Sequence, residues 1–106
     1  MDINVTILSG IIVTTPSWFP LLNNKRALVF TIKNQEVYRL SDGRVAKHAN
    51  HVTVEILGKL AERYFEELQS GKQYVVTGYL RVDEIKGADR TRIRAFRVDE
   101  VLSGDR

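Results

Sequence analysis

The residues of this sequence best suited to binding chemistry lie in the stretch YRLSDGRVAKHANH, residues 38–51. Asp42-Gly43 is a strong signal for a two-residue type I′ turn, because glycine accepts the positive φ that such a turn requires. The flanks of this turn offer few side chains for a core and instead carry Tyr38, Arg39, Arg44, Lys47, His48 and His51. We therefore predict a basic hairpin whose cations contact phosphates, with Tyr38 placed to stack on a base.

The positive charge of the chain is concentrated around this hairpin. The 106 residues have a net charge of only +3, but residues 25–54 contain six Lys or Arg against two Asp or Glu. A second basic series lies near the end of the chain: Arg90, Arg92, Arg94 and Arg97. Clustering of this kind indicates a surface for a polyanion more strongly than the total charge does. A solvated face that only favours solubility is the alternative that charge alone leaves open.

The length and composition exclude several other classes of protein. The length fits a single domain over residues 1–106. No apolar run is long enough to span a bilayer, and no basic segment precedes the first apolar run, so we expect no signal peptide. The absence of cysteine excludes disulfides and thiolate catalysis and fits a reducing cytoplasm.

The sequence shows no arrangement typical of an enzyme. Ser9 and Ser41 lie in no nucleophile elbow, and phosphate-binding loops and dinucleotide fingerprints are absent. His48 and His51 are three residues apart and lack cysteine partners, which is weak evidence for zinc. We expect a binding protein without a catalytic site, a metal or a cofactor.

Alternating apolar residues predict the strands that position the hairpin. In INVTIL (3–8), Ile3, Val5 and Ile7 share a face, and the pattern resumes in IIVTT after Ser9-Gly10. A glycine at this place indicates a strand that bends to serve both sides of a barrel. A loop is expected over 16–26 and a turn over 86–90. The remaining strands are expected over 27–37, 51–57, 72–85 and 91–102.

One segment, GKLAERYFEELQSG (58–71), has a helical pattern. Leu60, Tyr64 and Leu68 recur at helical spacing, Ala61 and Phe65 widen the stripe, and Gly71 is the expected stop. The element order β-β-β-α-β-β is that of the five-stranded Greek-key OB-fold barrel, in which a helix closes one end. An SH3-like barrel lacks this helix, and a ferredoxin-like fold needs two. We predict an all-β domain with one helix, in which the basic hairpin joins the second and third strands of an OB barrel.

Around the helix, the sequence resembles bacterial single-stranded DNA-binding proteins, the SSB family. The stretch VTVEILGKLAERYFEEL carries the helix start Gly58-Lys59-Leu60-Ala61-Glu62. The next strand leads to a glycine through Gly71, Val75, Thr77, Gly78 and Leu80. The small-residue break in ILSGIIVTTP and its Pro16 also fit, so the resemblance spans about residues 3–101.

The resemblance implies that single-stranded DNA wraps over the outer surface of the barrel and stacks bases on a few rings. Tyr38 and His51 fall where that family has tryptophans, Leu57 falls at a phenylalanine position, and Ile85 falls at a further tryptophan position. So few rings remain that we expect binding led by electrostatics. The expected binding residues are Tyr38, Arg39, Arg44, Lys47, His51, Leu57, Arg81, Lys86, Arg92 and Arg94.

Two further segments bear on the site. In TRIRAFRV (91–98), strict alternation gives no clean apolar face, so a bulge is needed. We expect Phe96 and Val98 in the core, with Arg92 and Arg94 near the open rim. In the first loop, Trp18-Phe19 is either a base-stacking pair or, preferably, a structural or subunit-interface pair.

The end of the chain suggests a second relative. The last residues, VLSGDR, lack the acidic tip of the SSB family, which fits either a tail-less member or a trimmed core. Primosomal replication protein N, a short OB dimer, is similar at Leu8-Ser9-Gly10, Thr15-Pro16 and Ser103-Gly104.

The function that these observations favour is sequence-tolerant binding of single-stranded DNA in replication, repair or recombination. We expect a homodimer or homotetramer in the cytoplasm, associated with the nucleoid. The alternatives are an OB interaction module whose main partner is another replication or primosome protein, and RNA binding on the same surface.

Overall fold

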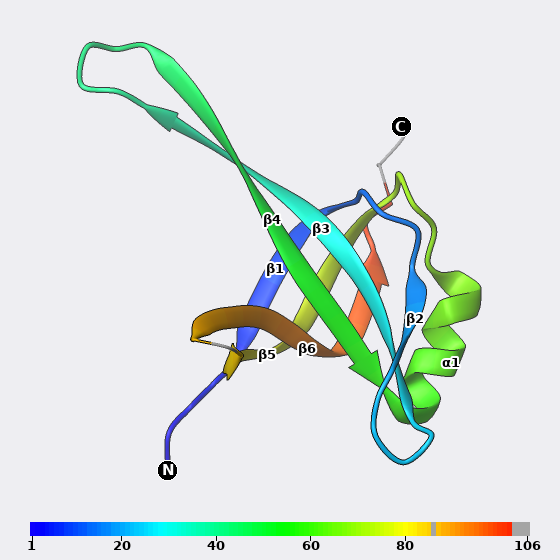
Figure 1. The fold of residues 1–106 in the computed structure, drawn as a ribbon. Coiled ribbons are helices and arrows are strands. Elements are labelled where there is room, and N and C mark those ends of the chain that lie inside the picture. The colour runs from blue at the N-terminus through cyan, green and yellow to red at the C-terminus, as the bar shows by residue number, and fades with distance from the viewer. Residues whose placement is uncertain (86, 103–106) are drawn as a thin grey trace.

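The computed structural model describes residues 1–85 and 87–102, which form a barrel of strands with one helix beside it (Figure 1). The elements of this part of the chain are β1 (Thr6–Ile12), β2 (Ser17–Pro20), β3 (Arg26–Arg39), β4 (Val45–Leu57), α1 (Gly58–Glu67), β5 (Gln73–Ile85) and β6 (Ala88–Glu100). Apart from the short β2, this is the predicted order, and the predicted OB fold is confirmed.

Five strands close the barrel in the order β1-β5-β6-β4-β3, and β1 then pairs with β3. All pairs are antiparallel except β4 with β6, which is parallel. β1 serves both sides because its first part pairs with β5 and its end, Ile11 and Ile12, pairs with β3. A Cβ on Gly10 would lie 2.3 Å from the carbonyl oxygen of Lys33. Only glycine therefore lets the two strands approach where the barrel closes.

The core lies inside this barrel and against α1. Its fully buried side chains include Phe30, Leu28, Ile32, Val54, Ile56 and Ile93. As predicted, α1 contributes Ala61 and Tyr64 from one stripe, and Leu68, the residue after the helix, packs into the same core. The helix ends at Glu67 and Leu68 takes an extended conformation, so the predicted stop at Gly71 is wrong. Gly71 instead adopts a positive φ in the turn that leads to β5.

The expected bulge is present in β6, but it reverses one burial prediction. Thr77 pairs with Arg97 while the next residue, Gly78, pairs with Ala95, so Phe96 is the extra residue. Ala95 and Val98 both face the core as a result. Phe96 is 54% exposed, so its predicted place in the core is wrong, whereas that of Val98 is confirmed.

Several predicted boundaries also change. The strand expected over 51–57 begins at Val45, and the strand expected over 91–102 begins at Ala88, so it overlaps the turn expected over 86–90. The expected loop over 16–26 contains β2, a four-residue edge strand that pairs with β3. The first strand begins at Thr6, so Ile3 and Val5 precede it, and both are exposed. Within the described residues, no helix has the length and the apolar character needed to cross a membrane.

Candidate nucleic-acid interface

β3 and β4 continue past the barrel as a two-stranded arm, residues 33–51, which projects from the rest of the molecule (Figure 1). The pair Ile32–Val52 is the last to face the core. Beyond it, the ladder runs without interruption from Lys33–His51 to Arg39–Val45. The arm is therefore held by backbone hydrogen bonds rather than by a core of its own.

The turn at the tip of the arm is not the predicted type I′ turn. Gly43 N donates to Leu40 O (2.9 Å) and Leu40 N donates to Arg44 O (2.8 Å), which closes a three-residue loop. Within that loop only Gly43 has a positive φ (90°). This is the geometry of a type I turn followed by a glycine bulge. The Arg44 guanidinium lies 2.6 Å from Asp42 at the exposed tip.

The strand register divides the arm into two faces. Residues directly opposite each other in an antiparallel pair share a face, and Ile32 with Val52 points into the barrel. Starting with the next pair, every second pair points to the opposite side of the arm; these pairs are Lys33–His51, Gln35–Ala49, Val37–Lys47 and Arg39–Val45. We call this side the basic face, because it carries three cations and His51 and no carboxylate.

Tyr38 lies on the other side of the arm. It pairs with Ala46 and shares its face with the pairs Glu36–His48 and Asn34–Asn50. Asn50 Nδ2 donates to both Glu36 (2.8 Å) and Asn34 (3.1 Å). This polar face is thus separate from the basic face. His48 and His51 consequently point to opposite sides of the arm.

On the barrel wall, the basic face continues into a cluster of ion pairs. The parallel register of β4 and β6 places Thr53 beside Arg92 and Glu55 beside Arg94. Glu55, only 7% exposed, accepts a hydrogen bond from Arg94 Nε (2.8 Å) and forms ion pairs with Arg92 Nε (2.8 Å) and Arg94 Nη2 (2.7 Å). Arg92 also donates from Nη2 to Asp83 Oδ2. Both predicted binding arginines therefore already hold a carboxylate.

This cluster sets the protonation of its members. The hydrogen bond from Arg92 lowers the pKa of Asp83 below its usual value, against a smaller opposing effect of desolvation, and the nearby charges of Arg81 and Arg94 add to the lowering. The pKa of Arg92 is raised mainly by the same hydrogen bond, with a further contribution from Glu55. The opposite directions of these two shifts keep the pair Asp83–Arg92 charged throughout the physiological pH range.

The wall extends across β6 onto β5. Arg81 is paired with Arg92 and Tyr79 with Arg94, so both residues share the side of the sheet that carries Glu55. By alternation along β4, Leu57 lies on this side as well. We call this surface, from Leu57 and Glu55 across to Tyr79 and Arg81, the outer wall.

The side chains of Trp18 and Phe19 point to opposite sides of β2. Trp18 pairs with Leu28 and packs against the core, with its ring 5.2 Å from that of Phe65. Phe19 pairs with Ala27 on the side of the outer wall, and it is 55% exposed. It lines a cavity of about 300 Å³ together with Thr53, Glu55 and Arg92. Trp18 thus has a structural contact, and Phe19 adds an exposed ring to the wall.

The structure brings most of the predicted binding residues to one side of the molecule. Those on the basic face or the outer wall are Arg39, Lys47, His51, Leu57, Arg81, Arg92 and Arg94. Tyr38 lies on the opposite face and Arg44 at the tip, whereas Lys86 lies outside the described residues, as does Ser103-Gly104.

Sequence reasoning missed Lys33 and Tyr79. Lys33 stands two residues before Gln35 in the alternation of β3, and Tyr79 alternates with Arg81 in β5. Both were visible as alternating positions, but only the register showed which side they share. Among the described residues, no group of three or more His, Asp or Glu is arranged to hold a metal ion.

Residues 3–101 match the single-strand binding protein family. The chain is similar to the crystal structure of a small single-stranded DNA-binding protein from Streptomyces coelicolor, with 25% identity and a TM-score of 0.69, covering 96% of this chain and 97% of that one. No curated protein is detectably similar to it.

Two structures with lower sequence identity share the fold. The SSB of Plasmodium falciparum, solved in complex with ssDNA, has 14% identity and a TM-score of 0.84, with 96% of this chain and 97% of that one covered. The wild-type single-stranded DNA-binding protein of Thermus aquaticus has 19% identity and a TM-score of 0.80, with 94% of this chain but 50% of that one covered.

Proposed function

The chain belongs to the single-strand binding protein family, and on this premise we propose that it binds single-stranded DNA along the arm and the outer wall without selecting a sequence. The role that follows is protection and handling of exposed strands in replication, repair or recombination in the cytoplasm. Its chemistry is binding rather than catalysis.

The observation that carries this proposal is the basic face. Lys33, Arg39 and Lys47 share one side of the arm, and among the described residues none of them forms an ion pair. Cations in a row along an extended element match the spacing freedom of a flexible phosphate backbone and read no base. We therefore expect this face to bind a strand and to tolerate any sequence.

The outer wall supplies the second part of the mechanism. Its rings Phe19 and Tyr79 offer apolar surfaces on which bases can stack, and Arg81 adds a cation beside them. Arg92 and Arg94 act mainly by keeping the wall in place, because Glu55 holds both of them. Since the arm is only two strands wide, a strand that crosses its edge also reaches Tyr38.

A titration with oligo-dT tests the proposal. We expect saturable binding, followed by the anisotropy of a labelled oligonucleotide at two salt concentrations. If Lys33, Arg39, Lys47 and Arg81 each neutralise one phosphate, the log–log salt slope is about −3. Absence of binding at low salt would refute the proposal, and tighter binding of oligo-U would assign the surface to RNA.

We also propose that the protein acts as a homodimer or a homotetramer. Ile7 (68% exposed) and Ile11 (44% exposed) of β1 point out of the barrel, on the side away from the core-facing Ile12. A second copy that covers this side removes apolar surface from water.

The same apolar side supports one alternative function. If it binds another replication or primosome protein instead of a second copy, the chain is an OB interaction module similar to primosomal replication protein N. Oligo-dT binding that is weak and insensitive to salt, together with a monomeric state, would favour this alternative.

A further inference from the structure

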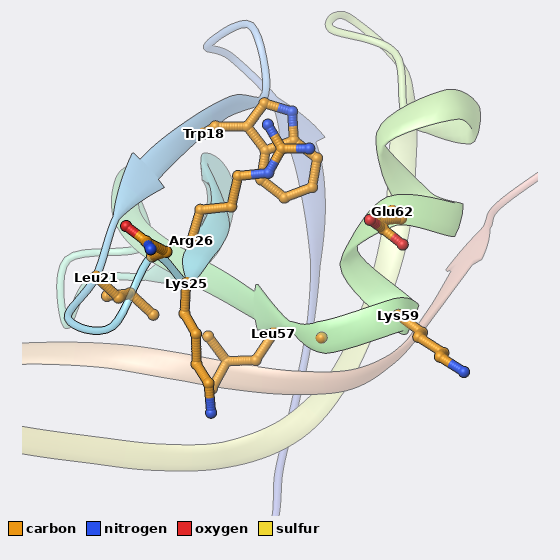
Figure 2. A pocket seen from close by; sticks show the side chains of 9 residues that line it. Trp18, Leu21, Lys25, Arg26, Leu57, Lys59 and Glu62 are labelled. Carbon is orange, nitrogen blue, oxygen red and sulfur yellow. The ribbon is translucent and has the colours of Figure 1, made fainter.

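A cavity of about 500 Å³ opens between the β2–β3 loop and the start of α1 (Figure 2). Its volume falls within the roughly 300–1,000 Å³ range of small-ligand sites. It is lined by Trp18, Leu21, Lys25, Arg26, Leu57 and Lys59, among others. Neither the basic face nor the cluster around Glu55 contributes to it.

The back of the cavity is a stack of flat groups. The Arg26 guanidinium lies over the Trp18 ring at 3.8 Å, and the Trp18 ring in turn packs against Phe65. Figure 2 shows Arg26 extended along the cavity toward the Trp18 ring. A guanidinium held flat in this way is a surface on which a nucleobase stacks.

The charge of the cavity favours an anion. Lys25, Arg26 and Lys59 line it, against a single carboxylate, Glu62. Among the described residues, none of these four side chains takes part in an ion pair. In Figure 2, Leu57 lies between the side chains of Lys25 and Lys59. An apolar floor with a lysine on each side suits a nucleotide, whose base is flat and whose phosphate is charged.

The cavity is continuous with the surface assigned to DNA. Leu21 lines both this cavity and the smaller one beside Phe19, and Leu57 belongs to the outer wall. A strand that leaves the wall past Leu57 therefore enters this cavity next.

We propose that the cavity is a nucleotide subsite, which takes one further nucleotide of a bound single strand. The base stacks on the Arg26 guanidinium, and Lys25 and Lys59 contact the adjoining phosphates. This inference rests on the proposed function. The flat Trp18–Arg26 stack favours a nucleobase over the side chains of an acidic peptide.

The length of the oligonucleotide distinguishes this subsite from the rest of the surface. A short oligo-dT that the arm and wall accommodate is compared with one several nucleotides longer, each by anisotropy. We expect Arg26→Ala to weaken the longer one by about fivefold or more, the effect of losing one stacked base, and to leave the short one nearly unchanged. Lys25→Ala and Lys59→Ala weaken the longer one by a smaller factor. Lys72→Ala, which removes the same charge outside the cavity, is the matched control.

Trp18 is the only tryptophan in the sequence, so its emission reports on the cavity directly. We expect the longer oligo-dT to change this emission and the short one to leave it unchanged. If both lengths bind but neither the emission nor the variants distinguish them, the subsite is refuted while the proposed function stands. If neither length binds, both fail. If a Glu-rich peptide changes the Trp18 emission and the longer oligo-dT does not, the cavity is a peptide site and the nucleotide subsite is refuted.

Discussion

At the scale of single residues, Glu55 is a buried carboxylate in a surface that is proposed to bind an anion, and these two properties seldom coincide. It is almost fully buried, yet it belongs to a wall that we propose to meet a polyanion. Its two partners explain this, because Arg92 and Arg94 are themselves mostly covered and need a counter-charge nearby. Removing one member of such a cluster leaves uncompensated charge in a poorly hydrated place.

Replacing Glu55 with Gln is expected to lower the stability of the protein and to strengthen its electrostatic binding of DNA. We expect the free energy of unfolding to fall by about 2–3 kcal/mol, somewhat less than for a fully buried pair because both arginines keep some exposure. The freed guanidinium groups then steepen the log–log salt slope of oligo-dT binding by about 1. Urea unfolding and titrations at two salt concentrations measure the two effects.

The matched control is Glu100→Gln, which breaks the exposed pair with Lys72 (3.6 Å). It is expected to change the unfolding free energy by less than about 0.5 kcal/mol. An unchanged salt slope in Glu55→Gln would mean that Arg92 and Arg94 do not reach phosphates even when released.

Asp83 makes stability depend on pH in the acid range. Its pKa is lower in the folded protein than in the unfolded chain, so the unfolded chain takes up protons first as the pH falls. The contribution of Asp83 is therefore complete above its unfolded pKa, about 4, and is lost as the pH falls through the folded value. We expect Asp83→Asn to flatten this part of the stability profile, measured by urea unfolding between about pH 3 and 6. Parallel profiles of the two proteins would contradict the assignment.

At the scale of elements, the register of the arm decides which side chains act together. Alternation within each strand was readable from the sequence, and it separates Tyr38 from Arg39. The pairing of β3 with β4 adds that Lys47 and His51 join Arg39, whereas Ala46 joins Tyr38. The basic residues and Tyr38 therefore lie on different faces of one arm, so their proposed roles can be tested by separate substitutions.

Two single substitutions on the arm test this separation. Lys47→Ala is expected to reduce the magnitude of the log–log salt slope by about 0.7, because one phosphate contact is lost. Tyr38→Ala is expected to weaken oligo-dT binding about tenfold through lost stacking, with the slope unchanged. Equal slopes for wild type and Lys47→Ala would exclude the basic face from the contact.

The elements that sequence reasoning placed correctly are those with long periodic patterns. The apolar alternation of β3 and β4 and the apolar stripe of α1 follow from burial of one side of each element. The spacing of apolar residues along the sequence reports this burial directly. β2 was missed because its four residues, which follow Pro16 and end at Pro20, are too few to show a period. The turn type was missed because Asp42-Gly43 suits both loop geometries, and the choice between them depends on the register of the strands.

At the scale of the whole molecule, barrel closure determines what remains exposed. β1 pairs with both β5 and β3, so its backbone is satisfied and only its outward side chains are available for contact. The alternation of Ile3, Val5 and Ile7 was recognised in the sequence, but that pattern alone does not tell an inward face from an outward one. All three are exposed in the single chain.

Replacing Ile7 with Glu tests whether a second copy covers this side. We expect the wild-type protein to sediment as a dimer or tetramer and the variant to shift toward the monomer, because a carboxylate would be desolvated in the interface. Leu22→Glu changes a still more exposed apolar side chain (87%) in the β2–β3 loop; it is the control and should keep the assembly. A monomeric wild-type protein would refute the assembly.

The projecting arm also has a kinetic consequence. Charges are screened beyond about 8 Å at physiological salt, so cations that extend past the barrel meet an approaching strand before the wall does. We therefore expect the arm to govern the association rate constant and salt to reduce this rate constant steeply. We expect the dissociation rate constant to depend on the rings of the wall, Phe19 and Tyr79, and to respond to salt through Arg81. Association with a strand is thus expected to depend mainly on the arm, and the lifetime of the complex mainly on the outer wall.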